Sequence, residues 1–309
     1  MARLGDTDLD VSRLCLGGNV FGWTIDEERS FEVLDAYAQG GGNFIDTADV
    51  YGRRGPDGAG GSERVIGRWI AARGNRERLV IATKVGASGG LSRAAIETAV
   101  QGSLERLGVE QIDLYYAHRD DRDTPLEETL AAFGRLIDSG AIRYAAASNY
   151  SAERLAQALE LGRRDGMASY VALQPHYNLL ERAEYEGELR PVCERHGLAC
   201  MPYYGLARGF LTGKYRPGGE EVSSPRAAGV RASYFNDRGF AVLAALDEVA
   251  AAHEESVAAV ALAWLMAQPT VLAPIASATS RGQMFELLPA TQLELTAAEL
   301  ERLSAVSAD

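Results

Sequence analysis

The segment Asn43-Phe-Ile-Asp-Thr-Ala-Asp-Val-Tyr-Gly52 places a carboxylate at the end of a short apolar run and a phenol just after it. The pattern recurs in Leu79-Val-Ile-Ala-Thr-Lys84, which ends in an amine, and in Asp113-Leu-Tyr-Tyr-Ala-His118, which ends in an imidazole. Short apolar runs are typical of buried strands. In a closed barrel of parallel strands, the carboxyl ends of all strands meet at one mouth. We therefore expect a proton-transfer site that gathers four ionisable groups, those of Asp46, Tyr51, Lys84 and His118.

Eight such runs lie along the chain, and eight is the strand number of a (β/α)8 TIM barrel. Segments with the apolar spacing of helices lie between them, for example around Ile96, Val100 and Leu104. This alternation favours parallel strands joined by right-handed crossovers, hence an α/β fold. The expected strands are Leu14–Gly17, Phe44–Asp46, Leu79–Lys84, Ile112–His118, Ile142–Ser148, Tyr170–Gln174, Ala199–Tyr203 and Val271–Ile275.

Capping signals suggest where two of the helices begin and end. Thr124 and Glu127 have the spacing of a capping box, and Gly140 suits the exit of that helix. Ser151 is predicted to cap the next helix, with Gly162 at its end.

Three further segments lie outside the strand and helix repeat. Residues 3–12 are expected to form a short hairpin that caps the barrel bottom. The glycine-rich stretch 53–61 follows Tyr51, and the turn-rich stretch 213–237 precedes helical patterns at about 237–253 and 256–267. Long loops on the carboxyl side of a barrel are usually functional, so both stretches are expected to be mobile and to gain order with ligand.

Composition narrows the class of protein. The chain has 309 residues, of which 47% are hydrophobic, and this length suits one barrel domain over residues 1–309. No apolar run reaches about 18 residues, and no signal-peptide core is evident, so a cytoplasmic protein is expected. The formal net charge of -12 opposes binding to nucleic acid or anionic membranes, which favours small-molecule partners. The three cysteines have no metal-ligand spacing and are expected to be free thiols, and no metal site is expected.

The motifs together resemble the aldo-keto reductases. They are Asp46-Thr-Ala-x-x-Tyr-Gly52, Ser62-Glu63, Thr83-Lys84, Tyr115-x-x-His-Arg119 and Ser148-Asn149, in this order, and the resemblance extends over nearly the whole chain. It implies a (β/α)8 barrel with an N-terminal hairpin, and a reductase that converts an aldehyde or ketone to an alcohol, reversibly.

The chemistry of the four groups fits that reaction. Reduction of a carbonyl requires hydride at carbon and a proton at oxygen, and a tyrosine with a pKa near 10 is a weak acid at neutral pH. Lys84 is expected to stabilise the Tyr51 phenolate, and Asp46 is expected to keep Lys84 charged and oriented. His118 is expected to position the carbonyl oxygen or to share in proton delivery.

No flavin, metal or Gly-x-Gly-x-x-Gly motif is evident, and the resemblance implies that a nicotinamide nucleotide supplies the hydride. The resemblance implies that the nucleotide lies across the barrel mouth and that Tyr203 stacks on the nicotinamide ring. NADP(H) is expected, with NAD(H) possible, because hydroxyls and Arg281 supply donors for a 2′-phosphate. The cofactor-binding residues that it implies are Ser148, Asn149, Gln174, Tyr203, Leu206, Arg208, Gly209, Lys214, Ser277, Thr279, Ser280, Arg281, Gln283 and Glu286. Among them, the residues from Leu206 to Lys214 resemble the loop that covers the pyrophosphate, and those from Ser277 to Glu286 resemble the segment that holds the adenosine end.

Some positions depart from the family pattern. The chain has Tyr203-Tyr-Gly-Leu206 where Tyr-Ser-Pro-Leu is frequent, and Leu287 where an asparagine is frequent. Ser277 and Gln283 lack the positive charge found there in some branches, so the preference for NADPH is expected to be small.

Substrate identity is not predicted beyond an aromatic, apolar mouth formed by Phe21, Trp23, Tyr51 and Tyr204. Two other classes of function stay open. One is a nucleotide-binding regulatory or sensor subunit that keeps the reductase scaffold with little turnover. The other is a metal-dependent barrel hydrolase, which the lack of a closely spaced histidine pair disfavours. The oligomeric state is not predicted.

Overall fold

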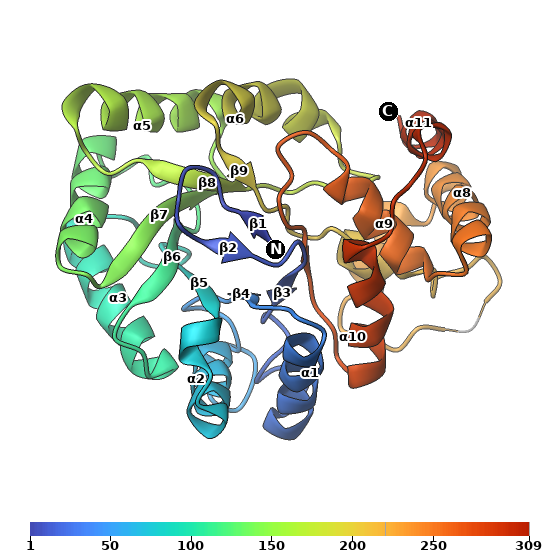
Figure 1. The fold of residues 1–309 in the computed structure, drawn as a ribbon, viewed down its shortest axis with the longest axis horizontal. Coiled ribbons are helices and arrows are strands. Elements are labelled where there is room, and N and C mark those ends of the chain that lie inside the picture. Colours follow the sequence, from blue (N-terminus) through green and yellow to red (C-terminus); the bar gives the residue numbers. More distant parts are fainter. Residues whose placement is uncertain (220, 309) are drawn as a thin grey trace.

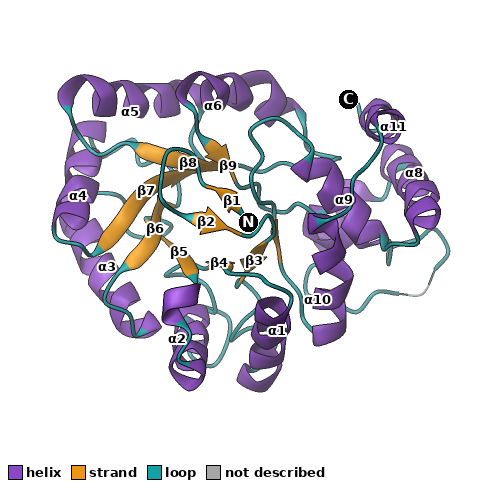
Figure 2. Ribbon diagram, in the orientation of Figure 1, coloured by secondary structure: helices purple, strands orange, loops and turns teal. Residues whose placement is uncertain are grey.

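A parallel sheet of eight strands forms the centre of the molecule, and helices surround it (Figures 1 and 2). The structure is a computed structural model that describes residues 1–219 and 221–308. It confirms the expected (β/α)8 barrel with an N-terminal hairpin sheet. The barrel strands are β3 (Cys15–Gly17), β4 (Phe44–Asp46), β5 (Val80–Val85), β6 (Ile112–Ala117), β7 (Ile142–Ser148), β8 (Tyr170–Gln174), β9 (Ala199–Cys200) and β10 (Ile275–Ala276).

The strands follow each other in the order β10-β3-β4-β5-β6-β7-β8-β9, and all seven neighbouring pairs are parallel. The two ends of this sheet are joined by an isolated parallel bridge between Cys200 and Val271. The backbone N–H of Ile275 also donates to the carbonyl of Pro202 at 2.9 Å. These contacts bring β9 and β10 together, so the carboxyl ends of the strands face one mouth.

The last two strands are shorter than predicted. The expected strand Ala199–Tyr203 ends at Cys200, and the expected strand Val271–Ile275 is reduced to β10 with a bridge at Val271. Proline explains both differences, because Pro202 and Pro274 carry no N–H to donate to a ladder.

Helices cover the outer face of the barrel, and Figure 2 shows α1 to α6 arranged around the strands. The helices are α1 (Glu27–Gln39), α2 (Gly61–Arg73), α3 (Arg93–Leu107), α4 (Leu126–Asp138), α5 (Ala152–Asp165), α6 (Arg190–His196), α7 (Ala227–Tyr234), α8 (Asp237–His253), α9 (Val257–Met266), α10 (Arg281–Leu287) and α11 (Ala297–Val306). The helices expected at about 237–253 and 256–267 are confirmed as α8 and α9.

Within residues 1–219 and 221–308, no single helix is long and apolar enough to cross a membrane. Only α8 and α9 together reach that length and apolarity, and they are bent by 96°. The side chains of α9 from Ala258 to Met266 are buried in the hydrophobic core.

Two of the expected helix boundaries are wrong. Thr124 does not form a capping box, because its hydroxyl donates to Asp121 at 2.7 Å and Pro125 occupies the N-cap of α4. Gly162 lies inside α5, which extends to Asp165. The C-cap of this helix is Gly166, whose φ is +65°. A Cβ at Gly162 would lie 2.9 Å from the Cβ of Ser169, so this glycine permits close packing. Ser151 is confirmed as the N-cap, since it accepts a hydrogen bond from the Arg154 N–H at 3.3 Å.

The hairpin of β1 (Ala2–Arg3) and β2 (Asp10–Val11) lies across the middle of the ring of strands in Figure 1. Its apolar side chains Leu4, Leu9 and Val11 are buried against the residues that fill the barrel interior, such as Leu114. The hairpin therefore fills the amino-terminal end of the barrel.

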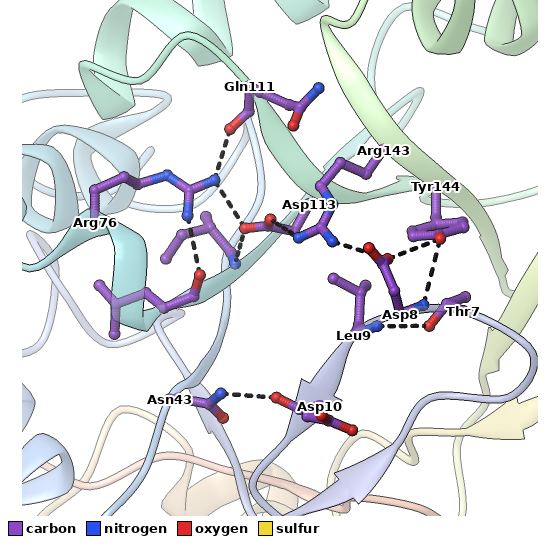
Figure 3. A network of polar contacts seen from close by, with 12 residues as sticks. Thr7, Asp8, Leu9, Asp10, Asn43, Arg76, Gln111, Asp113, Arg143 and Tyr144 are labelled. Atoms are coloured by element: carbon purple, nitrogen blue, oxygen red, sulfur yellow. Dashed lines mark hydrogen bonds and ion pairs between the residues drawn. The ribbon is translucent and has the colours of Figure 1, made fainter.

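Polar contacts fasten the hairpin to that end (Figure 3). Asp8 accepts hydrogen bonds from Arg143 and from the Tyr144 hydroxyl, each at 2.8 Å. Arg143 also donates to Asp113 at 2.9 Å, and Asp113 accepts from Arg76 at 2.8 Å. This chain of ion pairs connects the hairpin to β6 and β7 at their amino ends.

Candidate active site

A cleft of about 1070 Å³ opens at the carboxyl ends of the strands, opposite the hairpin. Asp46 is the last residue of β4, and His118 follows directly after β6. Tyr51 lies in the loop after β4, and Lys84 is in β5 one residue before its end. Asp46, Tyr51 and His118 line the cleft, and Lys84 lies directly beneath them, so the four groups converge as the strand pattern predicts.

Lys84 is fully buried and has three polar neighbours. Its ammonium donates to Asp46 at 2.6 Å and to the Thr47 carbonyl at 2.7 Å, and it lies 3.5 Å from the Tyr51 hydroxyl. A buried ammonium is costly without such partners. Burial lowers the pKa of Lys84, but the Asp46 carboxylate and Tyr51 outweigh burial, so the pKa is raised and the amine is charged.

Tyr51 lies against this ammonium, which is 4.9 Å from the centre of its ring. Burial raises the pKa of Tyr51 above its usual value, and Lys84 opposes this effect by Coulomb attraction. Lys84 therefore acts in the direction expected of it, stabilising the phenolate. In the protein alone, burial nevertheless prevails, and Tyr51 is a protonated phenol at neutral pH.

His118 is neutral across the physiological pH range. Burial lowers its pKa to about 3, with further contributions from Lys84 and Arg119. Its ring meets the Tyr51 ring edge-on at 6.0 Å, and its Nδ1 atom is buried without a hydrogen-bond partner among the described residues. A neutral imidazole can donate or accept a hydrogen bond, but it is not a cationic acid here.

The polar residues after β7 and β8 line the cleft and bond to one another. The Gln174 amide donates to Asp46 at 2.9 Å, so Asp46 has two donors. Asn149 donates to the His118 carbonyl at 2.8 Å and accepts from the Tyr203 hydroxyl at 2.8 Å. Ser148, also in the cleft, donates to the Gln174 carbonyl at 2.9 Å.

Tyr203 is held from two directions. Besides the bond from its hydroxyl to Asn149, its ring stacks on His176 with centroids 5.3 Å apart and planes at 8°. One face of Tyr203 is thus covered by an imidazole, which leaves its other face for a further flat ring. The sequence offers no separate signal for this role of His176, because the stacking depends on an isolated parallel bridge between His176 and Tyr203, beyond the ends of β8 and β9.

The segment after Tyr203 has an unusual backbone. Tyr204, Ala207 and Arg208 have φ of 54°, 46° and 58°, a left-handed conformation that is uncommon outside glycine. The Arg208 guanidinium lies 5.0 Å from the Tyr204 ring centre, and its Nε is buried without a hydrogen-bond partner among the described residues. Because a buried unpaired donor is costly, this atom suits an anionic group bound in the cleft. Leu206, Gly209 and Lys214 line the same part of the cleft.

The residues expected to bind the adenosine end of the cofactor fall into two groups. Ser277, Thr279, Gln283 and Glu286 line the cleft. Ser280 and Arg281 do not line it, contrary to the prediction. Ser280 instead accepts a hydrogen bond from the Gln283 N–H as the N-cap of α10. Arg281 donates to Gln39 at 3.3 Å and packs over the Phe285 ring at 5.2 Å, on the outside of the barrel.

The residues of the expected aromatic mouth lie in two different places. Trp23 and Tyr204 line the cleft, but Phe21 is fully buried in the hydrophobic core and lines no part of it. An apolar ring in a loop can turn toward the core or the cleft, and the core removes it from water. The cleft is also lined by residues that sequence reasoning missed, namely Asn19, Arg29, Arg53, Arg54 and Arg226. For Arg53 and Arg54, the available signal in the sequence was that two charged residues closely follow Tyr51.

A buried ion pair supports the strand that carries Lys84. Glu63, fully buried, accepts from the Thr83 hydroxyl at 2.6 Å and from Arg106 at 2.7 Å. Nearby, burial and Glu63 raise the pKa of Asp49 to about 6. The Ser62-Glu63 motif is thus structural support behind the site.

Comparison with known proteins agrees with this geometry. The model of the aldo/keto reductase family matches residues 13–308. An uncharacterized oxidoreductase of Bacillus subtilis (strain 168) is 33% identical over 304 residues, covering 94% of this chain and 91% of that protein. Versiconal hemiacetal acetate reductase of Aspergillus parasiticus is 30% identical over 336 residues, covering 98% and 95%.

A protein described as a probable voltage-gated potassium channel subunit beta, from Oryza sativa subsp. japonica, is 32% identical over 318 residues, covering 98% of this chain and 95% of that protein. The relatives thus include oxidoreductases and a protein with a channel-subunit name. The match to the family model extends over nearly the whole chain, including all four ionisable groups of the site. On these grounds, the chain belongs to the aldo/keto reductase family, whose general chemistry is carbonyl reduction.

Proposed function

We propose that the protein is an NAD(P)H-dependent oxidoreductase that reduces an aldehyde or ketone to an alcohol, and oxidises the alcohol when cofactor ratios allow. The observation that carries this proposal is the buried array in which Lys84 lies 2.6 Å from Asp46 and 3.5 Å from the Tyr51 hydroxyl. An ammonium held at this distance favours loss of the phenol proton to a substrate oxygen.

Each group has a separate role in this proposal. Tyr51 gives its proton to the carbonyl oxygen as general acid. A nicotinamide nucleotide, when bound in the cleft, would supply the hydride that the carbonyl carbon requires. Lys84 stabilises the phenolate that results, and Asp46, itself held by Gln174, keeps Lys84 in place. His118 is neutral, so it orients the carbonyl oxygen by a hydrogen bond rather than by positive charge.

The cleft residues fit a dinucleotide. Tyr203 offers one free face to the nicotinamide, with Ser148, Asn149 and Gln174 beside it. The unpaired Arg208 donor and Lys214 suit the pyrophosphate. We propose NADP(H) as the cofactor, with NAD(H) as the alternative, and small carbonyl compounds as the partners. We also propose that the protein is cytoplasmic and binds neither nucleic acid nor membranes. Its formal net charge of -12 supports the second part, because it opposes binding to these anionic partners.

The decisive experiment compares wild type with Tyr51→Phe. The variant keeps the ring but lacks the proton, so carbonyl reduction should fall by roughly three orders of magnitude or more while NADPH affinity is nearly unchanged. Cofactor fluorescence titration and single-turnover kinetics measure the two quantities. Retention of a tenth of the wild-type chemical rate would show that Tyr51 is not the acid.

A regulatory or sensor subunit with little turnover is the second candidate. The relative named as a potassium channel subunit beta favours it. The two candidates differ in steady-state NADPH consumption. A panel of aldehydes and ketones with turnover near zero, together with tight NADPH binding, would favour the sensor.

A further inference from the structure

The cleft carries positive charge on the side where Tyr51 lies. Arg53 and Arg54 follow Tyr51 by two and three residues and line the same cleft. At about 3.8 Å per residue, their Cα atoms lie within about 8–11 Å of that of Tyr51. We propose that the substrate is a carbonyl compound that also bears an oxyanion, a carboxylate or phosphate, bound by these two arginines. This inference rests on the proposed reductase function.

Neither arginine forms an ion pair with any residue in 1–219 or 221–308. The nearest acid in their loop, Asp57, pairs with Arg68 at 3.4 Å. Of the acids that line the cleft, Asp46 is paired with Lys84, and Glu286 belongs to the expected adenosine end. Both side chains are exposed at the cleft and carry no ion pair among the described residues, so they can meet an anion in a chain whose formal net charge is -12.

Two other cations of the cleft have a different proposed role. Arg208 and Lys214 belong to the segment after β9, on the side assigned to the pyrophosphate. Arg53 and Arg54 belong to the loop that carries the proton donor, so an anion that they bind is part of the molecule being reduced.

Arg54 packs on an aromatic residue that lines the same cleft. Its guanidinium carbon lies 5.6 Å from the centre of the Trp23 ring. A guanidinium that packs on an aromatic ring by its face keeps its in-plane N–H groups free, and these match the two oxygens of a carboxylate or phosphate. Trp23 thus supplies an apolar wall for the substrate and also supports the Arg54 guanidinium.

The backbone fixes the position of this loop. A Cβ at Gly55 would lie 1.6 Å from the carbonyl oxygen of Gly22, so the loop after β4 presses directly on the loop that carries Trp23. A Cβ at Gly52 would lie 2.9 Å from the Cα of Gly61. The N–H of Gly55 also donates to the carbonyl of Gly52 at 2.8 Å. Arg53 and Arg54 lie between these contacts, on a packed turn.

The test uses two aldehydes of similar size, 4-carboxybenzaldehyde and its neutral methyl ester, methyl 4-formylbenzoate. The measured quantity is the ratio of kcat/KM for the acid to that for the ester, in wild type and in the double variant Arg53→Gln/Arg54→Gln. We expect the double variant to lower this ratio about tenfold, mainly through KM for the acid, as for the loss of charge-assisted hydrogen bonds. The wild-type ratio should also fall as salt is added.

Arg78→Gln is the matched control, because Arg78 is exposed in the turn before β5, at the other end of the barrel. It should leave the ratio unchanged. An equal ratio in wild type and double variant, or an equal fall in the control, would overturn the inference while leaving the reductase proposal intact. 4-Formylphenyl phosphate provides the phosphate arm, where the same loss in the double variant supports the inference. No turnover of any of these aldehydes would overturn the reductase proposal and this inference with it.

Discussion

Replacing Lys84 by methionine should damage stability and chemistry for two separable reasons. The substitution leaves the Asp46 carboxylate buried with only the Gln174 amide as donor. Removing one partner of a buried ion pair typically costs about 3–5 kcal/mol of unfolding free energy. Denaturant titration of the cofactor-free protein measures this loss.

The chemical effect follows from the distance between the ammonium and the phenol oxygen. At 3.5 Å, a phenolate and an ammonium attract each other by roughly 5 kcal/mol at an effective dielectric constant of 20. Alcohol oxidation requires the Tyr51 phenolate, so its rate near neutral pH should fall about a thousandfold. The pKa of Tyr51, which burial already raises against the effect of Lys84, should rise further, and the pH profile of oxidation should move to higher pH.

The double variant Lys84→Met/Asp46→Asn separates the two effects. It removes both buried charges, so it should recover much of the unfolding free energy without recovering turnover. If the double variant is no more stable than Lys84→Met, an uncompensated Asp46 charge is not the cause of the loss. An oxidation profile that keeps its wild-type pH dependence in Lys84→Met would refute the coupling of Lys84 to Tyr51.

Three further predictions concern other parts of the site. The pKa of His118 is lowered to about 3, whereas an unfolded histidine titrates near 6.5, so the unfolded chain binds the extra proton between these values. The unfolding free energy should fall with decreasing pH in this window, by up to about 1.4 kcal/mol per pH unit, and urea titrations at several pH values should show this slope reduced in His118→Gln. In hydrogen exchange, the described residues of 213–237 should gain protection when NADPH binds, and Glu220 lies outside the described residues. The loop 53–61 is expected from the sequence to do the same, but its close contact with Gly22 and its internal hydrogen bonds lead us to predict that it is protected already. NADPH should bind more tightly than NADH by only about 1–3 kcal/mol, with Arg281→Ala as the test of that residue, and equal dissociation constants would exclude a preference.

The barrel and the centre of the site could be predicted because local pattern determines both. A strand that runs through the core and ends at or near an ionisable residue, as at Lys84 and His118, brings that residue to the carboxyl end of the barrel by topology alone. The predicted ends of the strands were less accurate where a proline interrupts the hydrogen-bond ladder, as at Pro202 and Pro274.

The predicted and observed positions of residues differ where side chains from distant segments of the chain make the contacts. Gly162 resembles a helix end, but the approach of Ser169 explains it. Phe21 is predicted to line the pocket, but its side chain is buried in the hydrophobic core. Arg281 is predicted to bind the 2′-phosphate, and here its guanidinium donates to Gln39 on α1 at 3.3 Å. None of these contacts has a signature in the local sequence.

The close contact between Gly55 and Gly22 has a consequence for engineering the protein. Two loops in such close backbone contact leave no room for longer side chains there, and a change in loop length would displace Tyr51, the proposed proton donor. New substrate preferences should therefore be accessible through side-chain libraries at positions such as 23, 53 and 54, with the glycines held constant. Libraries that randomise Gly52 or Gly55 should consist mostly of inactive members, and sequencing a selected pool would show glycine retained at both positions.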